Sequence, residues 1–228
     1  MITQARVKAF GKPIAGLLLW SALSVFSAPA EAMTVYNLNY VFSPATGAVP
    51  PMGTVTLTDL GTSVRFDIVN NAGAGSKLDS LYFNFLHGTT NPNQLVFSNI
   101  SAATGTYATL LAPLTTSTLA GLKADGDGYF DGKFEYTSNN FLANGQTLSF
   151  QLSATGQDLA ESDFHFFSLP GGGSGSYILA SHIQNLQPGG TSAWVGTTAV
   201  AAVPLPGAAL MFLSGLSGLA FVRKRFAA

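Results

Sequence analysis

The sequence predicts an all-β protein, a single antiparallel β-sandwich of jelly-roll-like connectivity, with an apolar segment at each end of the chain. Three observations support this fold class. Apolar and polar residues alternate with period two through the middle of the chain, turn-forming residues separate the alternating segments, and none of the 228 residues is cysteine. A chain of this length can form one medium-sized β domain, held together by core packing and sheet hydrogen bonds.

The first 32 residues have the three parts of a cleavable export signal. Basic residues lie within positions 6–12, an apolar run follows over 14–26, and Ala30 and Ala32 occupy the small positions of a cleavage site. We therefore predict a signal peptide that engages the Sec translocon, with Met33 as the first mature residue. The alternative is an uncleaved anchor, for which the run is short against the roughly 20 residues of a membrane span.

The predicted β domain covers residues 33–186 and begins with three alternating segments. In the first, Tyr36, Leu38, Tyr40 and Phe42 are expected to share one face of a strand. The second and third lie at 55–57 and 64–68. They are expected to form a hairpin whose turn is Asp59-Leu60-Gly61, since Asp and Gly favour tight turns.

The later strands follow the same pattern. They are expected around residues 81–85, 95–100, 134–136, 148–152, 164–166 and 177–183. Residues 101–112 and 114–122 fit either a strand or a short helix. Residues 187–202, with proline and many small side chains, are expected to be a surface linker.

Charge and composition exclude several classes of function. Residues 33–205 carry four cations against ten acids, a net charge of −6, whereas the two ends are basic. Nucleic acid is therefore not an expected partner, because phosphate binding needs a basic patch. The absence of cysteine excludes disulfides, a thiolate nucleophile and a Cys-ligated zinc site.

One acidic loop is a candidate calcium site. Asp125, Asp127 and Asp131 are each followed by glycine, and Ca²⁺ prefers several hard oxygen ligands on flexible backbone. The spacing is not that of an EF-hand, and an ordinary hairpin turn explains the same composition. Calcium is the one cofactor that the sequence suggests.

Catalytic motifs are absent, and we predict no enzymatic activity. Glu161, Asp163 and His165 are expected on one face of a strand, with Phe164 and Phe166 on the other. Two carboxylates and an imidazole could bind a metal or perform acid–base chemistry, which leaves a secreted hydrolase as one alternative. The simpler interpretation is the solvated face of a core strand. The glycine-rich stretch 171–176 lacks the Lys-Ser/Thr of a phosphate loop and fits a turn.

The C-terminus has the features of a membrane-inserted sorting tail. The segment Val203-Pro204-Leu205-Pro206 precedes an apolar run over 207–222, and a basic cluster follows at once. These 16 residues would form a helix of about 24 Å, short against a hydrocarbon core of roughly 30 Å. The basic cluster predicts a cytoplasmic end, which places the β domain outside the inner membrane.

These three elements, in this order at the C-terminus, resemble the PEP-CTERM family of sorting domains. The resemblance covers residues 203–228, with Leu205 where the family usually has Glu, as in its VPLP-type variant. It implies recognition of Val203, Pro204, Leu205 and Pro206 by an exosortase, a membrane cysteine transpeptidase. It further implies that Arg223, Lys224 and Arg225 are the stop-transfer charges. An ordinary single-span anchor is the alternative.

The function expected from both ends is that of a non-enzymatic surface or extracellular-matrix protein. The resemblance implies a Gram-negative host, an inner-membrane-anchored precursor, and later release or attachment at the cell surface. It also implies an association with biofilm and exopolysaccharide. The alternatives are a secreted carbohydrate- or calcium-binding module and the carboxylate-dependent hydrolase.

Overall fold

The computed structural model describes the body of the chain and neither of its ends. It describes residues 31–43, 45–85, 94–101, 107–111, 122–125, 127–137, 139–171, 173, 175–197 and 201–202, with the backbone alone at 107–111 and 201–202. In these residues no helix has the length and apolar character needed to cross a membrane.

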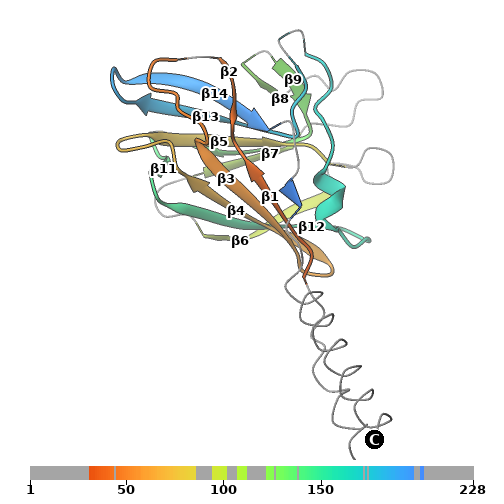
Figure 1. Cartoon of the computed structure of the whole chain (residues 1–228). Helices are drawn as coiled ribbons and strands as arrows, with labels where there is room; N and C mark the ends of the chain where they lie inside the picture. Colours follow the sequence, from red (N-terminus) through yellow and green to blue (C-terminus); the bar gives the residue numbers. More distant parts are fainter. Residues whose placement is uncertain are drawn as a thin grey trace, which may run out of the picture. The chain divides into compact units, whose positions relative to one another are not determined.

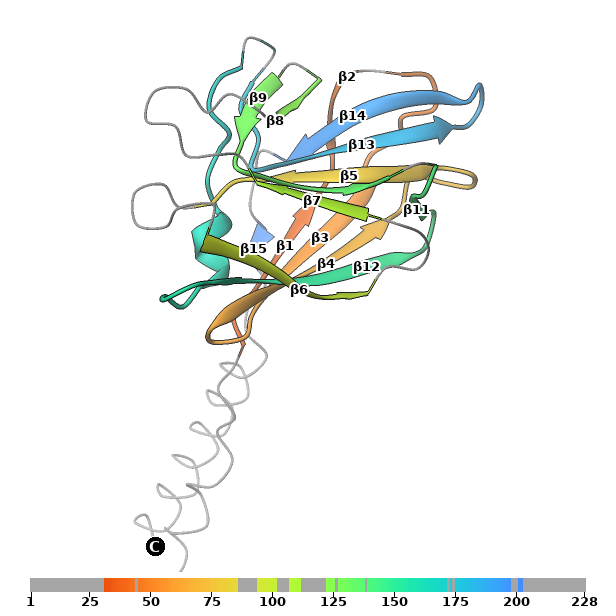
Figure 2. The ribbon, with the colours of Figure 1, turned by 180° about the vertical axis from the view of Figure 1, so that it is seen from behind.

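Two antiparallel sheets pack against each other, which confirms the predicted β-sandwich-like, all-β class (Figures 1 and 2). Sheet A contains, in spatial order, β15 (Ala201–Ala202), β1 (Met33–Asn37), β3 (Gly53–Asp59), β4 (Ser63–Asn70), β12 (Thr147–Ala154) and β6 (Leu95–Ser101). Sheet B contains β2 (Tyr40–Ser43), β14 (Thr191–Thr197), β13 (Leu179–Leu186), β5 (Lys77–Phe83), β10 (Gly132–Tyr136) and β7 (Tyr107–Leu111). The short β11 (Leu142–Ala143) also pairs with β5, and β8 (Leu122–Ala124) with β9 (Asp127–Phe130) forms a separate ribbon.

The predicted hairpin at residues 59–61 is confirmed. It joins β3 to β4, whose register pairs Asp59 with Val64. The Gly61 N–H donates to the Asp59 carboxylate at 2.7 Å, and Gly61 has a φ of 88°. Asp supplies the local acceptor and Gly the left-handed backbone, so this turn follows from local sequence.

The first predicted strand is wrong in one respect, because it is two strands in different sheets. Tyr36 lies in β1 of sheet A, whereas Tyr40 and Phe42 lie in β2 of sheet B. The chain crosses between the sheets at Leu38, whose side chain is fully buried. Tyr40 therefore does not share the buried face of Tyr36 and is 43% exposed.

Stacked aromatic rings fill the core between the sheets. Phe66 and Phe150 of sheet A stack with ring centroids 5.0 Å apart, and Phe150 also stacks on Phe134 of sheet B at 5.3 Å. Phe83 and Phe164 complete this group from the sheet B side and from the short segment that follows β12. Since the chain has no cysteine, no disulfide adds to this packing between the two sheets.

The predicted linker also needs correction. Residues 187–202 are not a linker: they contain β14, which pairs with β13 and β2, and β15, which pairs with β1. Their small side chains fit a closely packed sheet, as at Gly196, where the ring of Tyr177 lies over the backbone. The ambiguous stretch 101–112 contains the strand β7, whereas most of 114–122 lies outside the described residues.

Stability is expected to fall in alkaline solution because of a buried phenol. Burial raises the pKa of Tyr136 from its ordinary value of 10 to about 12. The folded state then holds this proton more tightly than the unfolded state does. The contribution of the Tyr136 phenol to the free energy of unfolding is therefore complete below about pH 10 and is lost as the pH rises toward 12. Urea unfolding across that range should show a smaller decline for Tyr136→Phe. Parallel pH profiles for the two proteins would contradict this assignment.

Candidate ligand-binding face

The outer face of sheet B gathers polar side chains from adjacent strands. Outward-facing positions on β13 carry His182 and Gln184, and β5 contributes Asp79. The pairing of these strands shifts register at this point: His182 pairs with Ser80 and Ile183 with Leu78, which leaves Asp79 as the extra residue of a β-bulge. Such a bulge redirects a side chain, and here it brings the Asp79 carboxylate beside both residues of β13.

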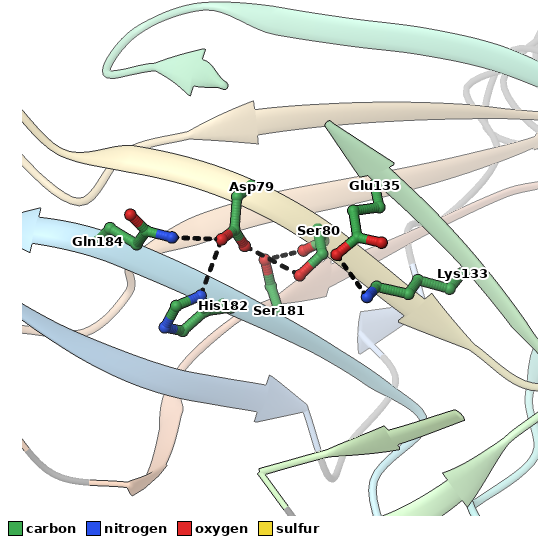
Figure 3. Close-up of polar contacts among 7 residues, drawn as sticks. All are labelled: Asp79, Ser80, Lys133, Glu135, Ser181, His182 and Gln184. Carbon is green, nitrogen blue, oxygen red and sulfur yellow. Dashed lines mark hydrogen bonds and ion pairs between the residues drawn. The ribbon is translucent and has the colours of Figure 1, made fainter. Parts of the chain in front are cut away.

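Asp79 is the acceptor at the centre of this group (Figure 3). Its Oδ2 lies 2.9 Å from Nδ1 of His182 and also accepts the side-chain amide of Gln184, while Oδ1 accepts the Ser80 hydroxyl at 3.0 Å. The Ser181 hydroxyl donates to the Ser80 carbonyl at 2.6 Å. These bonds fix the orientation of both β13 side chains. The amide oxygen of Gln184 and the second imidazole nitrogen of His182 point away from Asp79 (Figure 3).

Aromatic side chains flank this polar group on one side. The His182 ring stacks on Trp194 of β14 at 4.7 Å between centroids, and Trp194 also meets Tyr82 at 5.6 Å. Further along β2, Phe42 stacks on Tyr177 at 4.4 Å. The β8–β9 ribbon covers this end of the face, since its apolar residues form a second buried cluster with Tyr82 and Tyr177.

Lysines on this side of the molecule lie over aromatic rings. The ammonium group is 4.4 Å from the ring centre in the Lys77–Phe141 pair and 4.9 Å in the Lys133–Tyr82 pair. Lys133 also forms an ion pair of 2.6 Å with Glu135 (Figure 3). Burial acts to lower the pKa of Lys133, but the contacts with Glu135 and Tyr82 outweigh it and raise that pKa above its usual value. Lys133 therefore remains charged at neutral pH.

Three shallow depressions surround Lys77 at the other end of the face, and we call them together the Lys77 groove. Their volumes are about 200, 450 and 490 Å³, and Lys77 lines all three. Gln184 lines the first two, with Asp79 in the first and His182 in the second. The remaining lining mixes small and aromatic side chains with four side-chain amides, those of Asn139, Asn140, Asn144 and Asn185.

The predicted calcium ligands do not converge. Asp125 lies in the β8–β9 turn with a φ of 49°. Asp131 is fully buried, and its Oδ2 accepts the backbone N–H of Phe85 at 3.1 Å. Across the part of the chain that the structure describes, no three His, Cys, Asp or Glu side chains could hold a metal ion together. The three carboxylates have separate places: Asp125 lies in a turn, Asp127 packs against Gly173, and Asp131 makes a contact in the core.

The strand predicted around 161–166 is wrong. Residues Glu161–Phe164 form a 3-10 turn, and its two carboxylates bind neighbouring backbone. Asp163 accepts the N–H of Ala160 at 2.9 Å, and Glu161 accepts that of Ser162 at 2.7 Å. Phe164 is still buried in the core, which is why the sequence alternation resembled a strand. Glu161, Asp163 and His165 thus do not line one strand face.

The glycine-rich stretch after this turn packs closely on the β8–β9 ribbon. A Cβ at Gly173 would overlap the Asp127 carboxylate, and a Cβ at Gly171 would lie 2.5 Å from the backbone nitrogen of Gly128. The Lys123 ammonium donates to the Gly171 carbonyl at 2.9 Å. Glycine is therefore required at Gly171 and Gly173 for close approach to the ribbon.

The predicted sorting residues lie mostly outside the described residues. These are Ala30, Val203, Pro204, Leu205, Pro206, Arg223, Lys224 and Arg225. Of the cleavage site, Ala32 and Met33 are described, and Met33 is the first residue of β1.

The polar group on sheet B is not evident from the amino-acid sequence. Asp79 lies 103 positions from His182 and reaches it only through strand pairing. The sequence does contain one local sign of a polar face: His182 and Gln184 are two residues apart on one strand and therefore lie on the same face.

Fold and side chains together define the chain as an antiparallel β-sandwich with an amide- and aromatic-lined outer face on sheet B. Comparisons with protein-family models, with curated proteins and with solved structures each find no match for this chain.

Proposed function

We propose that this chain is an exported, non-enzymatic surface or extracellular-matrix protein, sorted through its C-terminal tail by an exosortase. In this proposal the Sec translocon exports the chain, the signal peptide is removed before Met33, and the tail holds the precursor in the inner membrane. Processing at the tail then places the β domain at the cell surface or outside the cell, in association with exopolysaccharide. The sandwich would have jelly-roll-like connectivity, consistent with the repeated crossings between sheets at β1–β2–β3 and β4–β5–β6.

One structural observation supports the proposed boundaries. The first described strand, β1, begins at Met33, and the last described strand, β15, ends at Ala202, directly before Val203. The two strands pair antiparallel, with Thr34 opposite Ala202. The first and last described strands therefore lie side by side at one edge of sheet A. Removal of both predicted signals would leave this pairing intact.

The hydrolase alternative has less support. Its two carboxylates, Glu161 and Asp163, are acceptors for backbone N–H groups within one turn. Carboxylates that hold a turn are poorly placed to act as a general acid and base on opposite sides of a substrate bond.

Intact-mass analysis of the protein from membrane and extracellular fractions of its own host tests the proposal. We expect a form that begins at Met33, ends near Val203–Pro206 and lies outside the inner membrane. Changing both Pro204 and Pro206 to alanine should leave the precursor in the membrane, whereas Gln151→Ala on the outer side of sheet A should be processed normally. A native protein that retains Phe226-Ala227-Ala228 and is confined to the inner membrane would overturn the proposal.

A further inference from the structure

We propose that the Lys77 groove is a binding site for a neutral polysaccharide chain, which it recognises through the sugar hydroxyl groups. This inference deepens the proposed function. It rests on that function only for the location in which the protein would encounter its ligand. The binding itself is a property of the groove and is tested apart from sorting.

The lining of the groove has the hydrogen-bonding chemistry that hydroxyl groups need. An amide side chain has two N–H donors and a carbonyl acceptor, so an amide held by one internal hydrogen bond, as Asn140, Asn144 and Asn185 are, can still bond to an adjacent hydroxyl. Gln184 is already held by its N–H bond to Asp79, and its carbonyl oxygen points away from that carboxylate (Figure 3). His182 is held in the same way through Nδ1. Side chains fixed before binding lose less conformational entropy when the ligand arrives.

An apolar surface accompanies these polar groups. Phe141 lines two of the three depressions and carries the Lys77 ammonium on its ring. Trp194 supports the His182 ring from the other side. A sugar ring presents both C–H and O–H groups, and a site with a few fixed polar atoms among aromatic surfaces matches that mixture.

The charges of the groove favour a neutral ligand. Lys77 and Asp79 line the same depression, so the cation is opposed by an anion within the site. Nearby, Lys133 is paired with Glu135. An acidic chain would gain little from Lys77 and would be repelled by Asp79, whereas a neutral chain is indifferent to both.

Strand pairing argues against an extended peptide as the ligand. The groove lies over β5 and β13, each of which pairs with strands on both sides. Their backbone N–H and C=O groups are used within the sheet, so no peptide can add there as a further strand. Any ligand must be bound through side chains. Because the depressions are shallow and adjoin at Lys77 and Gln184, they fit an extended chain that crosses several strands.

The test is calorimetric titration of the full-length protein, kept in a detergent without a sugar headgroup. The neutral probes are soluble fragments of cellulose, mannan, xylan and starch, and the acidic probes are fragments of alginate and polygalacturonate. We expect at least one neutral probe to bind. Gln184→Ala should weaken that binding about tenfold, which corresponds to one or two hydrogen bonds lost.

Gln151→Ala is the matched control. Gln151 is a strand glutamine on the outer side of sheet A, where its carbonyl accepts from Asn99 at 2.7 Å. It should leave the affinity unchanged, and neither variant should alter the melting temperature appreciably, because Gln184 is an exposed side chain. No binding of any neutral probe, equal affinity in the two variants, or a preference for the acidic probes would overturn the inference. The mass and location of the native protein, measured separately, would still decide the proposed function.

Discussion

Replacing Phe150 with alanine should remove a large part of the folding stability of this protein. Phe150 lies in β12, is fully buried, and stacks between Phe66 of the same sheet and Phe134 of the opposite sheet. Phe97 of β6 also contacts its ring at 5.4 Å. One ring therefore connects three strands of sheet A with β10 of sheet B. Loss of a buried phenylalanine costs about 3–5 kcal/mol, set against a typical total of about 5–15 kcal/mol.

The measurement is urea unfolding followed by tryptophan fluorescence, with Phe167→Ala as the control. Phe167 is a ring of the same size that is 51% exposed, so its removal should change the free energy of unfolding by less than about 1 kcal/mol. With no cysteine in the chain, no disulfide can offset the loss at Phe150. Equal unfolding midpoints for the two variants would show that the aromatic stack does not join the sheets as described.

Adding one methyl group at Gly132 should also destabilise the protein, by a smaller amount. Gly132 opens β10 directly opposite Phe83 of β5, and a Cβ there would overlap the Phe83 ring. That ring cannot move aside, because it is fully buried against Phe66, Phe97 and Phe164. We expect Gly132→Ala to lower the free energy of unfolding by about 1–3 kcal/mol through overpacking.

Gly175→Ala is the appropriate comparison for Gly132→Ala. At Gly175 the nearest atom to an added Cβ is the Tyr177 hydroxyl at 3.5 Å, an ordinary contact. Thermal unfolding of the two variants should separate them clearly, with Gly175→Ala close to the native protein. A Gly132→Ala protein that unfolds at the native temperature would mean that the core has room beside Phe83.

Much of the β domain could be predicted because its signals are local. The β3–β4 hairpin needs only an Asp acceptor, a Gly in the left-handed region and two alternating strands, all within 18 residues of sequence. The core positions Phe66, Phe134 and Phe150 also follow from alternation, since each is flanked by polar residues. Local alternation misleads at Glu161–Phe164, where side-chain carboxylates satisfy the backbone of a 3-10 turn and only Phe164 reaches the core.

The polar group on sheet B could not be predicted, because long-range strand pairing creates it. Asp79 meets His182 and Gln184 only through the register of β5 against β13, and only because a bulge turns its carboxylate outward. No short-range pattern encodes a register shift between strands about 100 positions apart. The calcium prediction also depended on sequence spacing alone. Spacing does not reveal that the Asp131 carboxylate is buried in the core, where it accepts the backbone N–H of Phe85.

The amino-acid sequence by itself determined the fold class, the turn at Asp59-Leu60-Gly61 and most of the buried aromatic positions, because each depends on residues close together in the chain. Tertiary structure decided which strands share a sheet, where the chain crosses at Leu38, and which polar side chains meet around Asp79 and Lys77. Those outcomes depend on strand order and register, which are settled by packing two whole sheets together.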